Sequence, residues 1–359
     1  MKPETNFQSL LLFFLFFSYI NTQWKREKGG TGLYRYELEV LEQYGIQTDN
    51  LIRGRGSWIC DTGEELKILQ EYTGSVQKLI WQKLIQERAE DGGVALTDLL
   101  LPNQEGELYS RDRAGTVYIL RNWYRARECD THAKQDIRKG TEVLARLHNT
   151  VQIPYQAQYA PPLLYDECCR HNRELRRAAT YLRKKKSKNE FEETLYSRID
   201  DMIRQGEEAV ARMAEHASGY AVENGEMSVC HGDYTQHNVL FAGGQTVLTG
   251  FGRWNFDRTT ADLYQFMRKI LEKNDWNRQL GVHMVRWYSA IRPLDEMDIT
   301  DLMLRLSYPW KSWKLVNYYM QSSKSIPPRK NMEKIHKILK QQDNWQYFIN
   351  FLFSDLFFQ

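Results

Sequence analysis

Residues 231–238 read His-Gly-Asp-Tyr-Thr-Gln-His-Asn, with an acid, Asp233, five positions before an amide, Asn238. A short apolar run at 227–230 leads into this stretch, and a second run at 239–241 leads out of it to a Gly-Gly pair. Apolar runs separated by polar and Gly-rich segments predict a strand, a loop, a second strand and a tight turn.

A His-x-Asp followed by an Asn at this spacing is the catalytic-loop pattern of enzymes that transfer phosphoryl groups. In such a loop the Asp accepts the proton of the attacking hydroxyl, and the Asn holds Mg²⁺ against the nucleotide phosphates. His231, Asp233 and Asn238 are therefore candidate catalytic residues, and Asn238 is also a candidate metal ligand. A turn rich in Gly, Asp and Asn needs no catalytic role, so the loop alone leaves a purely structural alternative open.

Earlier in the chain, strand-like runs at 57–60 and 65–72 flank turn residues at 61–64, which predicts a β-hairpin. Arg-Gly-Arg-Gly at 53–56 precedes the hairpin, and Lys67 lies on its second strand. In a nucleotide-binding hairpin, the glycines let the backbone approach phosphates and the lysine reaches them as a point charge. Lys67 is the candidate nucleotide-binding lysine, with an ordinary solvated lysine as the alternative.

Residues 75–90 carry apolar side chains at helical spacing. In a nucleotide-binding lobe this helix would supply a carboxylate to pair with Lys67. Glu87 is the candidate for that role, while Gln86 and Glu90 are close enough in sequence to compete.

A strand is predicted at 115–124, and a hinge between two lobes belongs at its end. Trp123 is accordingly the candidate contact to the nucleotide base, whose edge would bond to the hinge backbone. From residue 191 onward the periodicity is helical, apart from the loop region 226–262. Helices are predicted at 263–274, 280–291, 298–306, 310–322 and 330–342, with Asp262 capping the first of them.

The order of these features resembles that of the aminoglycoside phosphotransferase and choline kinase-like superfamily. Within it, the chain is similar to the CotS-type spore coat family over residues 35–352. The similarity rests on four stretches, which are Arg-Gly-Arg-Gly at 53–56, Arg-Glu-Cys-Asp at 127–130, Asp-Leu-Tyr-Gln-Phe-Met-Arg-Lys at 262–269 and Tyr-Pro-Trp-Lys-Ser-Trp-Lys at 308–314.

The resemblance implies an α+β, bilobal protein kinase-like fold. A small β-rich lobe is expected at 34–121, and a large, mainly helical lobe at 122–359 around the loop 231–238. It also implies ATP and Mg²⁺ as cofactors if the protein is active, other spore coat proteins as partners, and a location in the mother-cell cytoplasm and then in the spore coat.

One departure from the superfamily pattern affects the expected function. Active members carry Asp-Phe-Asp or a near relative after the catalytic loop, and the first Asp chelates Mg²⁺. The matching residues here are Gly250-Phe251-Gly252, and glycine has no side-chain ligand to offer. Asp257, seven residues beyond Gly250, could compensate only if a loop brought it back. The departure favours a catalytically impaired, pseudokinase-like coat protein, and the alternative is an ATP-dependent small-molecule phosphotransferase with Asp233 as base.

Composition narrows the remaining classes of protein. The 359 residues carry a net charge of +3, a mild excess that does not indicate nucleic-acid binding. The basic run at 183–188 is expected to be a solvated surface. The five cysteines form no Cys-x-x-Cys pair, which argues against a zinc site or a disulfide framework and for reduced thiols.

The amino terminus holds an apolar stretch at 10–20, which is too short for a comfortable membrane span and is not followed by a small-x-small cleavage pattern. Three interpretations stay open: a weak membrane anchor, an uncleaved export signal, or a start codon assigned upstream of the true one. We favour the last, with residues 1–33 outside the fold.

Overall fold

In a computed structural model of the protein, the described residues are 35–48, 51–54, 56–63, 65–216, 227–322 and 328–355. The apolar stretch at 10–20 lies outside them. The chain separates into two compact units, of which the first comprises residues up to Gly74 together with Leu101–Arg121. The second comprises Ser75–Leu100 and the chain from Asn122 onward, so it includes the helical segment that the expected division assigned to the first lobe.

The first unit is a β-sheet with one helix, in which β1 and β2, β2 and β3, and β6 and β7 pair antiparallel. Its elements are α2 (Arg35–Glu42), β1 (Leu51–Gly54), β2 (Ser57–Asp61), β3 (Leu66–Glu71), β6 (Ser110–Arg111) and β7 (Val117–Trp123), the last of which runs to the boundary between the units. The strands follow the order β1-β2-β3-β7-β5, with β6 paired to β7 and the two-residue β5 (Leu100–Leu101) at the edge. β2 and β3 pair with Lys67 opposite Cys60, which confirms the predicted hairpin.

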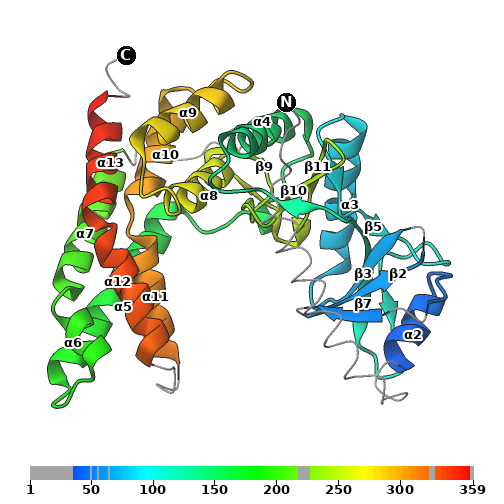
Figure 1. Cartoon of the computed structure of the whole chain (residues 1–359), viewed down its shortest axis with the longest axis horizontal. Helices are drawn as coiled ribbons and strands as arrows, with labels where there is room; N and C mark the ends of the chain where they lie inside the picture. The colour runs from blue at the N-terminus through cyan, green and yellow to red at the C-terminus, as the bar shows by residue number, and fades with distance from the viewer. Residues whose placement is uncertain are drawn as a thin grey trace, which may run out of the picture. The chain divides into compact units, whose positions relative to one another are not determined.

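The core of the first unit forms where α2 covers the sheet (Figure 1). Alternate strand residues point toward the helix, because successive side chains of a strand point to opposite faces. Trp58 and Cys60 on β2 and Tyr118 and Leu120 on β7 follow this spacing, and they pack with α2 residues in one buried cluster.

The second unit begins with α3 (Val76–Asp91), which Ser75 caps by accepting a hydrogen bond from the Lys78 N–H. A four-stranded sheet follows in the order β4-β11-β10-β8, and a two-stranded sheet pairs β12 with β9. These strands are β4 (Leu96–Thr97), β8 (Arg127–Glu128), β9 (Ser228–Cys230), β10 (Val239–Ala242), β11 (Gln245–Leu248) and β12 (Asn255–Asp257). Residues 231–238 therefore join β9 to β10, as predicted.

The turn after β10 is also the predicted one. Ala242 pairs with Gln245 across a two-residue connection. Gly243 and Gly244 both have positive φ, 55° and 87°, which is the requirement of the hairpin turn that best matches the strand twist.

Helices make up most of the second unit. They are α4 (Lys134–Thr150), α5 (Leu164–Lys184), α6 (Glu190–Tyr196), α7 (Ile199–Glu215), α8 (Thr260–Leu271), α9 (Arg278–Ser289), α10 (Glu296–Ser307), α11 (Trp310–Gln321), α12 (Pro328–Lys340) and α13 (Gln342–Asp355), with short 3₁₀ turns η1 (Ala157–Tyr159) and η3 (Phe251–Arg253). α5 packs against α7 and α11, and α12 packs against α6 and α11 (Figure 1). α4, α8 and α9 pack together beside the strands that hold the loop 231–238. The fold is thus α+β, with a β-rich N-terminal part and a helical C-terminal part, as expected.

The thiols are free, and four of the five cysteines are buried while Cys169 is half-buried. None of the helices described is long and apolar enough to cross a membrane.

His171 on α5 is a buried titratable group between α5 and α11. Its ring stacks on Trp313 with centroids 3.4 Å apart. Its Nε2 lies 3.1 Å from Arg170 Nη2, so it accepts a hydrogen bond in the neutral ring. Burial, with the charges of Arg170 and Lys314, lowers the pKa of His171 to about 3, although Glu167 Oε1 lies 3.8 Å from Nε2 and favours protonation.

Acidification should therefore destabilise the protein through His171. A pKa lowered in the folded state means that the unfolded chain binds the proton first, so stability is complete above the unfolded pKa of about 6.5 and falls as the pH drops toward about 3. At pH 5 the loss from this group is on the order of 2 kcal/mol. Urea unfolding of His171→Gln from pH 7.5 to 5 should show a shallower loss than the native protein. The exposed His336→Gln serves as control, and equal slopes for both variants would contradict the assignment.

Candidate functional site

One buried carboxylate binds the backbone at the start of the catalytic-type loop 231–238. Asp262, in the first turn of α8, accepts hydrogen bonds from the backbone N–H of His231 at 2.6 Å and of Gly232 at 2.9 Å. Its Oδ2 also lies 3.2 Å from His148 Nε2. We expected Asp262 to cap the N–H groups of its own helix. The carboxylate instead accepts hydrogen bonds from the backbone of the loop, so this expectation is wrong.

His148 completes this arrangement in its neutral form. Its Nδ1 lies 2.7 Å from the Tyr288 hydroxyl, which leaves Nε2 to donate to Asp262. Burial lowers the pKa of His148, which keeps the ring neutral. Burial alone would raise the pKa of Asp262, but the hydrogen bonds from His148 and from the His231 N–H lower it below its usual value. Asp262 is therefore a buried anion whose charge is met by donors.

His231 is a structural part of the loop. Its side chain is buried, and Nε2 lies 2.9 Å from the Thr249 carbonyl oxygen, to which it donates. Its Nδ1 accepts the Asp233 N–H at 3.2 Å. Because both nitrogens are engaged with the backbone, His231 fixes the direction of the loop and has no free nitrogen for a ligand.

Tyr234 fixes the middle of the loop. Its fully buried ring meets Phe266 of α8 edge to face, with centroids 5.3 Å apart. Its hydroxyl donates to the Gly140 carbonyl oxygen on α4 at 2.7 Å. The residue after the candidate base is thus anchored to two helices, so that the backbone beside Asp233 has little freedom.

The structure brings Asp233 and Asn238 together. Asn238 donates from Nδ2 to the Asp233 carbonyl oxygen at 2.8 Å, and its own N–H donates to Thr235. The half-buried Asp233 carboxylate makes no hydrogen bond or ion pair with any residue that the structure describes. The Asp233 carboxylate acts on Lys269 of α8. Burial lowers the pKa of Lys269, and the charge of Asp233 opposes part of this effect. A carboxylate in this state can accept a hydrogen bond and a proton from a substrate hydroxyl that comes within reach.

Gly250 follows β11, and its backbone has a conformation that suits glycine. Its φ is 85° and its ψ is 25°, in the left-handed region. A Cβ at this position would lie 2.8 Å from Asn238 Nδ2 and 2.9 Å from Oδ1. A side chain at the position where the resemblance expects an acid would therefore be strained by the positive φ and would require the side chain of Asn238 to shift.

Asp98 is an acid near this position that no sequence motif marks. It follows β4, is fully buried, and accepts the Gly250 N–H on Oδ2 at 2.9 Å. Its Oδ1 accepts from Gln86 Nε2 at 2.9 Å, and Gln86 Oε1 accepts the Leu100 N–H. Asp98 thus holds the backbone of Gly250 in place, and burial together with these bonds makes it unsuited to take up a metal ion.

A two-acid Mg²⁺ site does not fit the residues around Asn238. Asp257 is occupied elsewhere, because Arg305 Nη2 lies 2.7 Å from its Oδ1 and the Arg258 N–H also donates to it. Among the described residues, one group of three possible ligands meets, namely His148, Cys230 and Asp262. The Cys230 thiol donates to backbone carbonyls, and the other two bond to each other and to the loop. Asn238 remains the one side chain placed for a metal by the catalytic-loop pattern.

The other candidate residues have local partners. Glu87 pairs with Lys83 one turn earlier on α3, and Glu90 accepts hydrogen bonds from Thr97. Lys67 pairs with Glu65 in the first unit, and Trp123 ends β7 half-buried. Nucleotide contacts of Lys67, Glu87 and Trp123 stay predictions.

Replacing the loop-holding carboxylate should be costly. Asp262→Asn leaves buried N–H donors of the loop without an anionic acceptor, so the free energy of unfolding should fall by about 2–4 kcal/mol. The matched control is Asp91→Asn, because Asp91 is exposed at the end of α3. Urea titration followed by tryptophan fluorescence measures both variants. A loss for Asp262→Asn no larger than that for Asp91→Asn would show that the loop does not depend on this carboxylate.

Adding a side chain at Gly250 should also destabilise the protein. Gly250→Ala combines a positive φ with a Cβ against Asn238, and about 1–3 kcal/mol should be lost. Gly252→Ala is the control, since a Cβ there meets nothing within 4 Å. Gly250→Asp, which introduces the acid that the resemblance leads us to expect, should lose at least as much. The measurement is the midpoint temperature of thermal unfolding for the three variants. An unchanged midpoint for Gly250→Ala would contradict the geometry.

Solved structures share this fold at low sequence identity. An aminoglycoside phosphotransferase from Alicyclobacillus acidocaldarius is 16% identical with a TM-score of 0.78, covering 89% of this chain and 96% of that one. A spectinomycin phosphotransferase in complex with ADP and spectinomycin is 15% identical with a TM-score of 0.64, covering 89% and 97%. A microcompartment-associated aminopropanol kinase is 13% identical with a TM-score of 0.56, covering 88% and 97%. Such identities show the fold alone.

Sequence comparison identifies the family. No curated protein matches the chain. A family model described as spore coat putative kinase YutH matches residues 37–352, which confirms the predicted spore coat and kinase-like relationship. The chain belongs to the YutH family of spore coat putative kinases.

Proposed function

We propose that this protein is a kinase-fold component of the spore coat whose phosphoryl-transfer activity is impaired. The observation that carries the proposal is the backbone of Gly250. An acid at this position would be strained by the left-handed conformation and would displace the side chain of Asn238, the other residue expected to bind Mg²⁺. Restoring the acid by substitution at Gly250 would therefore also require the backbone around Gly250 to change conformation.

The energetic consequence is large, because phosphoryl transfer depends on neutralising charge in the transition state. The protein contributes mainly by positioning the reactants and by electrostatic stabilisation, and the metal ion supplies much of the latter. Every 1.36 kcal/mol of lost stabilisation slows the reaction about tenfold. A site with Asn238 and no neighbouring acid would hold the metal weakly and would lose several orders of magnitude in rate.

The loop itself retains the form that phosphoryl transfer uses, and this favours a second candidate. The Asp233 carboxylate forms no hydrogen bond or ion pair within the described part of the chain, and Asn238 donates a hydrogen bond to the Asp233 carbonyl oxygen. In the alternative, the protein is an ATP-dependent phosphotransferase in which Asp233 accepts the proton of a substrate hydroxyl. Lys67 would then contact the nucleotide phosphates, and Trp123 would lie near its base.

Location and partners follow from the family. The proposed setting is the mother-cell cytoplasm and then the spore coat, with other coat proteins as partners. A nucleotide remains a proposed ligand in both candidates, because ADP is bound in the solved spectinomycin phosphotransferase that shares the fold. In the impaired form, binding of ATP would depend little on Mg²⁺, since the acid that couples the metal to the phosphates is missing.

The test compares turnover and binding in the full chain. ATP hydrolysis and transfer to hydroxyl acceptors are followed by phosphate release and mass spectrometry, and ATP affinity is measured with and without Mg²⁺. We expect turnover at least about 10³-fold below the 1–100 s⁻¹ usual for kinases, and an affinity that Mg²⁺ changes by less than about threefold. Turnover near 1 s⁻¹ that Asp233→Asn abolishes and Asp91→Asn retains would replace the proposal with the active alternative.

A further inference from the structure

Helix α12 presents a stripe of lysines to solvent. Lys330, Lys334 and Lys337 lie four and three residues apart, which places them on one side of the helix, and all three side chains are exposed. The apolar side chains of the helix lie on its opposite side and are buried, namely Met332, Ile335 and Ile338. Packing of this apolar side against α6 and α11 therefore fixes the direction in which the lysines point.

Positive charge is concentrated in this helix. α12 contains five lysines and arginines against one glutamate, while the entire chain of 359 residues has a net charge of +3. The glutamate, Glu333, has its Oε1 3.4 Å from Arg329 Nε. Lys330, Lys334 and Lys337 form no ion pair with any residue that the structure describes. Three neighbouring positive charges are thus left without a paired carboxylate.

The neighbouring helix α11 extends this surface, because the two helices pack against each other (Figure 1). Lys334 Nζ lies 5.1 Å from the centroid of the Tyr318 ring, and Tyr318 is 53% exposed. Lys314, one turn before Tyr318, is also exposed and forms no ion pair within the described part of the chain. We call Lys314, Tyr318, Lys330, Lys334 and Lys337 the basic face.

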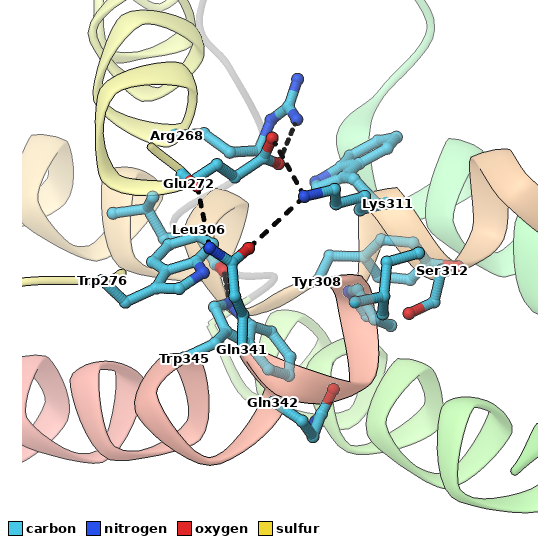
Figure 2. A pocket seen from close by; sticks show the side chains of 13 residues that line it. Arg268, Glu272, Trp276, Leu306, Tyr308, Lys311, Ser312, Gln341, Gln342 and Trp345 are labelled. Carbon is cyan, nitrogen blue, oxygen red and sulfur yellow. Dashed lines mark hydrogen bonds and ion pairs between the residues drawn. The ribbon is translucent and has the colours of Figure 1, made fainter. Parts of the chain in front are cut away.

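Two contacts set the register of α11 and α12. Tyr318 meets Lys334, and Lys311 Nζ lies 3.5 Å from Gln341 Oε1, just beyond the end of α12 (Figure 2). The helices therefore run antiparallel. Lys314, midway between Lys311 and Tyr318, is level with the last two turns of α12, so the lysines of the two helices form one continuous surface.

The carboxylate beside this surface is already occupied. Figure 2 shows both Arg268 and Lys311 directed toward Glu272, at 2.8 Å and 3.6 Å from its carboxylate oxygens. A carboxylate that is shared by two cations has no charge to spare for a third. Glu272 therefore leaves the charge of the basic face unbalanced.

Another basic segment of the chain, at 183–188, is different. Arg183 bonds to Asp200 at 2.6 Å, and Lys185 pairs with the buried Glu192. Carboxylates of α6 and α7 thus lie beside the cations of this segment. The excess of charge is a property of the basic face, and it is not shared by every basic run of the chain.

The spacing of the lysines matches that of acids on an extended chain. Along the axis of α12, Lys334 is separated from Lys330 by about 6 Å and from Lys337 by about 4.5 Å. In an extended segment, side chains on one face recur every second residue, about 6.6 Å apart. Carboxylates at alternate positions can therefore reach successive lysines. Tyr318 adds the kind of aromatic contact that is common in protein interfaces.

Two other classes of polyanion fit the basic face less well. A helix that binds a lipid surface inserts apolar side chains between the lipids, and the apolar residues of α12 are buried in the protein core. Strong binding of double-stranded DNA draws on many phosphate contacts, on the order of 6–10, and their number exceeds that of the lysines in the basic face.

We propose that the basic face binds an acidic, extended segment of another protein, whose carboxylates pair with the four lysines while Tyr318 contacts the body of the segment. The inference rests on the proposed function only for its setting, a coat in which other proteins are the partners. Exposed charge pairs contribute little individually, so the complex forms rapidly, is of modest affinity and weakens as salt is added.

The test measures binding of a synthetic peptide to the full chain at low ionic strength, without nucleotide. The peptide has about ten residues, in which Glu alternates with the β-branched Thr so that an extended form is favoured. A second peptide carries Gln in place of every Glu. Each peptide bears an uncharged dye, and fluorescence anisotropy follows its binding.

The basic-face variant is Lys330→Gln/Lys334→Gln/Lys337→Gln. Its side chains are exposed and form no ion pair with a described residue, so folding should be retained.

The matched control is Arg177→Gln/Lys184→Gln/Lys186→Gln, which removes the same charge at exposed positions on and just after α5.

The Glu peptide should bind saturably and the Gln peptide should not. The basic-face variant should weaken binding about tenfold or more, and the control should change it less than about twofold. Absence of binding, or equal losses in the two variants, would overturn the proposal. A DNA duplex or phosphatidylserine vesicles that bind more tightly than the peptide and lose binding in the same variant would reassign the face and overturn it as well. So would a salt-sensitive dimer of the native chain that sedimentation shows to be lost in the variant.

Turnover assays separate this inference from the proposed function. The basic-face variant should have the same turnover and the same ATP affinity as the native chain, because none of its residues belongs to the catalytic-type loop. Turnover near about 1 s⁻¹ in a native chain that still binds the peptide would defeat the impaired function and leave the basic face standing. A chain without turnover that also fails to bind the peptide would defeat this inference alone.

Discussion

The hydrogen bonds of Asp262 are the interaction on which the geometry of the site depends. A carboxylate with nearly no access to water must be met by donors, because an uncompensated buried charge costs several kcal/mol. The donors here are two consecutive backbone N–H groups of the loop and a neutral His148. The direction of the backbone at His231 and Gly232 is thus set by α8. Tyr234, bonded to Gly140 on α4, extends the same constraint to the residue after Asp233.

The region around Gly250 shows how a loop can keep this form after one of its acids is lost. The N–H of Gly250 is bonded to Asp98, and Asp98 in turn is bonded to Gln86 of α3. A carboxyl group therefore remains close to Gly250, but it is buried and bonded to the backbone. Asn238 fills the space that a side chain at Gly250 would need. The result is a loop whose backbone is held on several sides. A fixed backbone alone does not restore the charge neutralisation that phosphoryl transfer requires.

The sequence predicted the parts of this arrangement that depend on local pattern. The strand-loop-strand around 231–238, the Gly-Gly turn, the hairpin that carries Lys67 and the helical C-terminal part follow from turn residues and periodicity, and the structure contains them. The partners of Asp262 and the presence of Asp98 could not be predicted, since each joins segments far apart in the chain and no local pattern marks them. Asp262 sits in the first turn of a helix, where capping is the usual role of an acid. Because Asp262 is buried against the loop, its carboxylate binds the loop backbone instead, and no local sequence pattern indicates that contact.

The missing acid separates the shape of the loop from the chemistry that the loop would perform. A magnesium-dependent site places acids around a metal, so that the metal can meet anionic phosphates. Here Gly250 offers no carboxylate, Asp98 is buried and bonded to the Gly250 N–H, and Asp257 is paired with Arg305. The direction of the loop backbone depends on none of these acids, because Asp262 and Tyr234 hold it from α8 and α4. The fold can therefore keep the form of the catalytic-type loop while the oxygen ligands that a metal ion requires are lost.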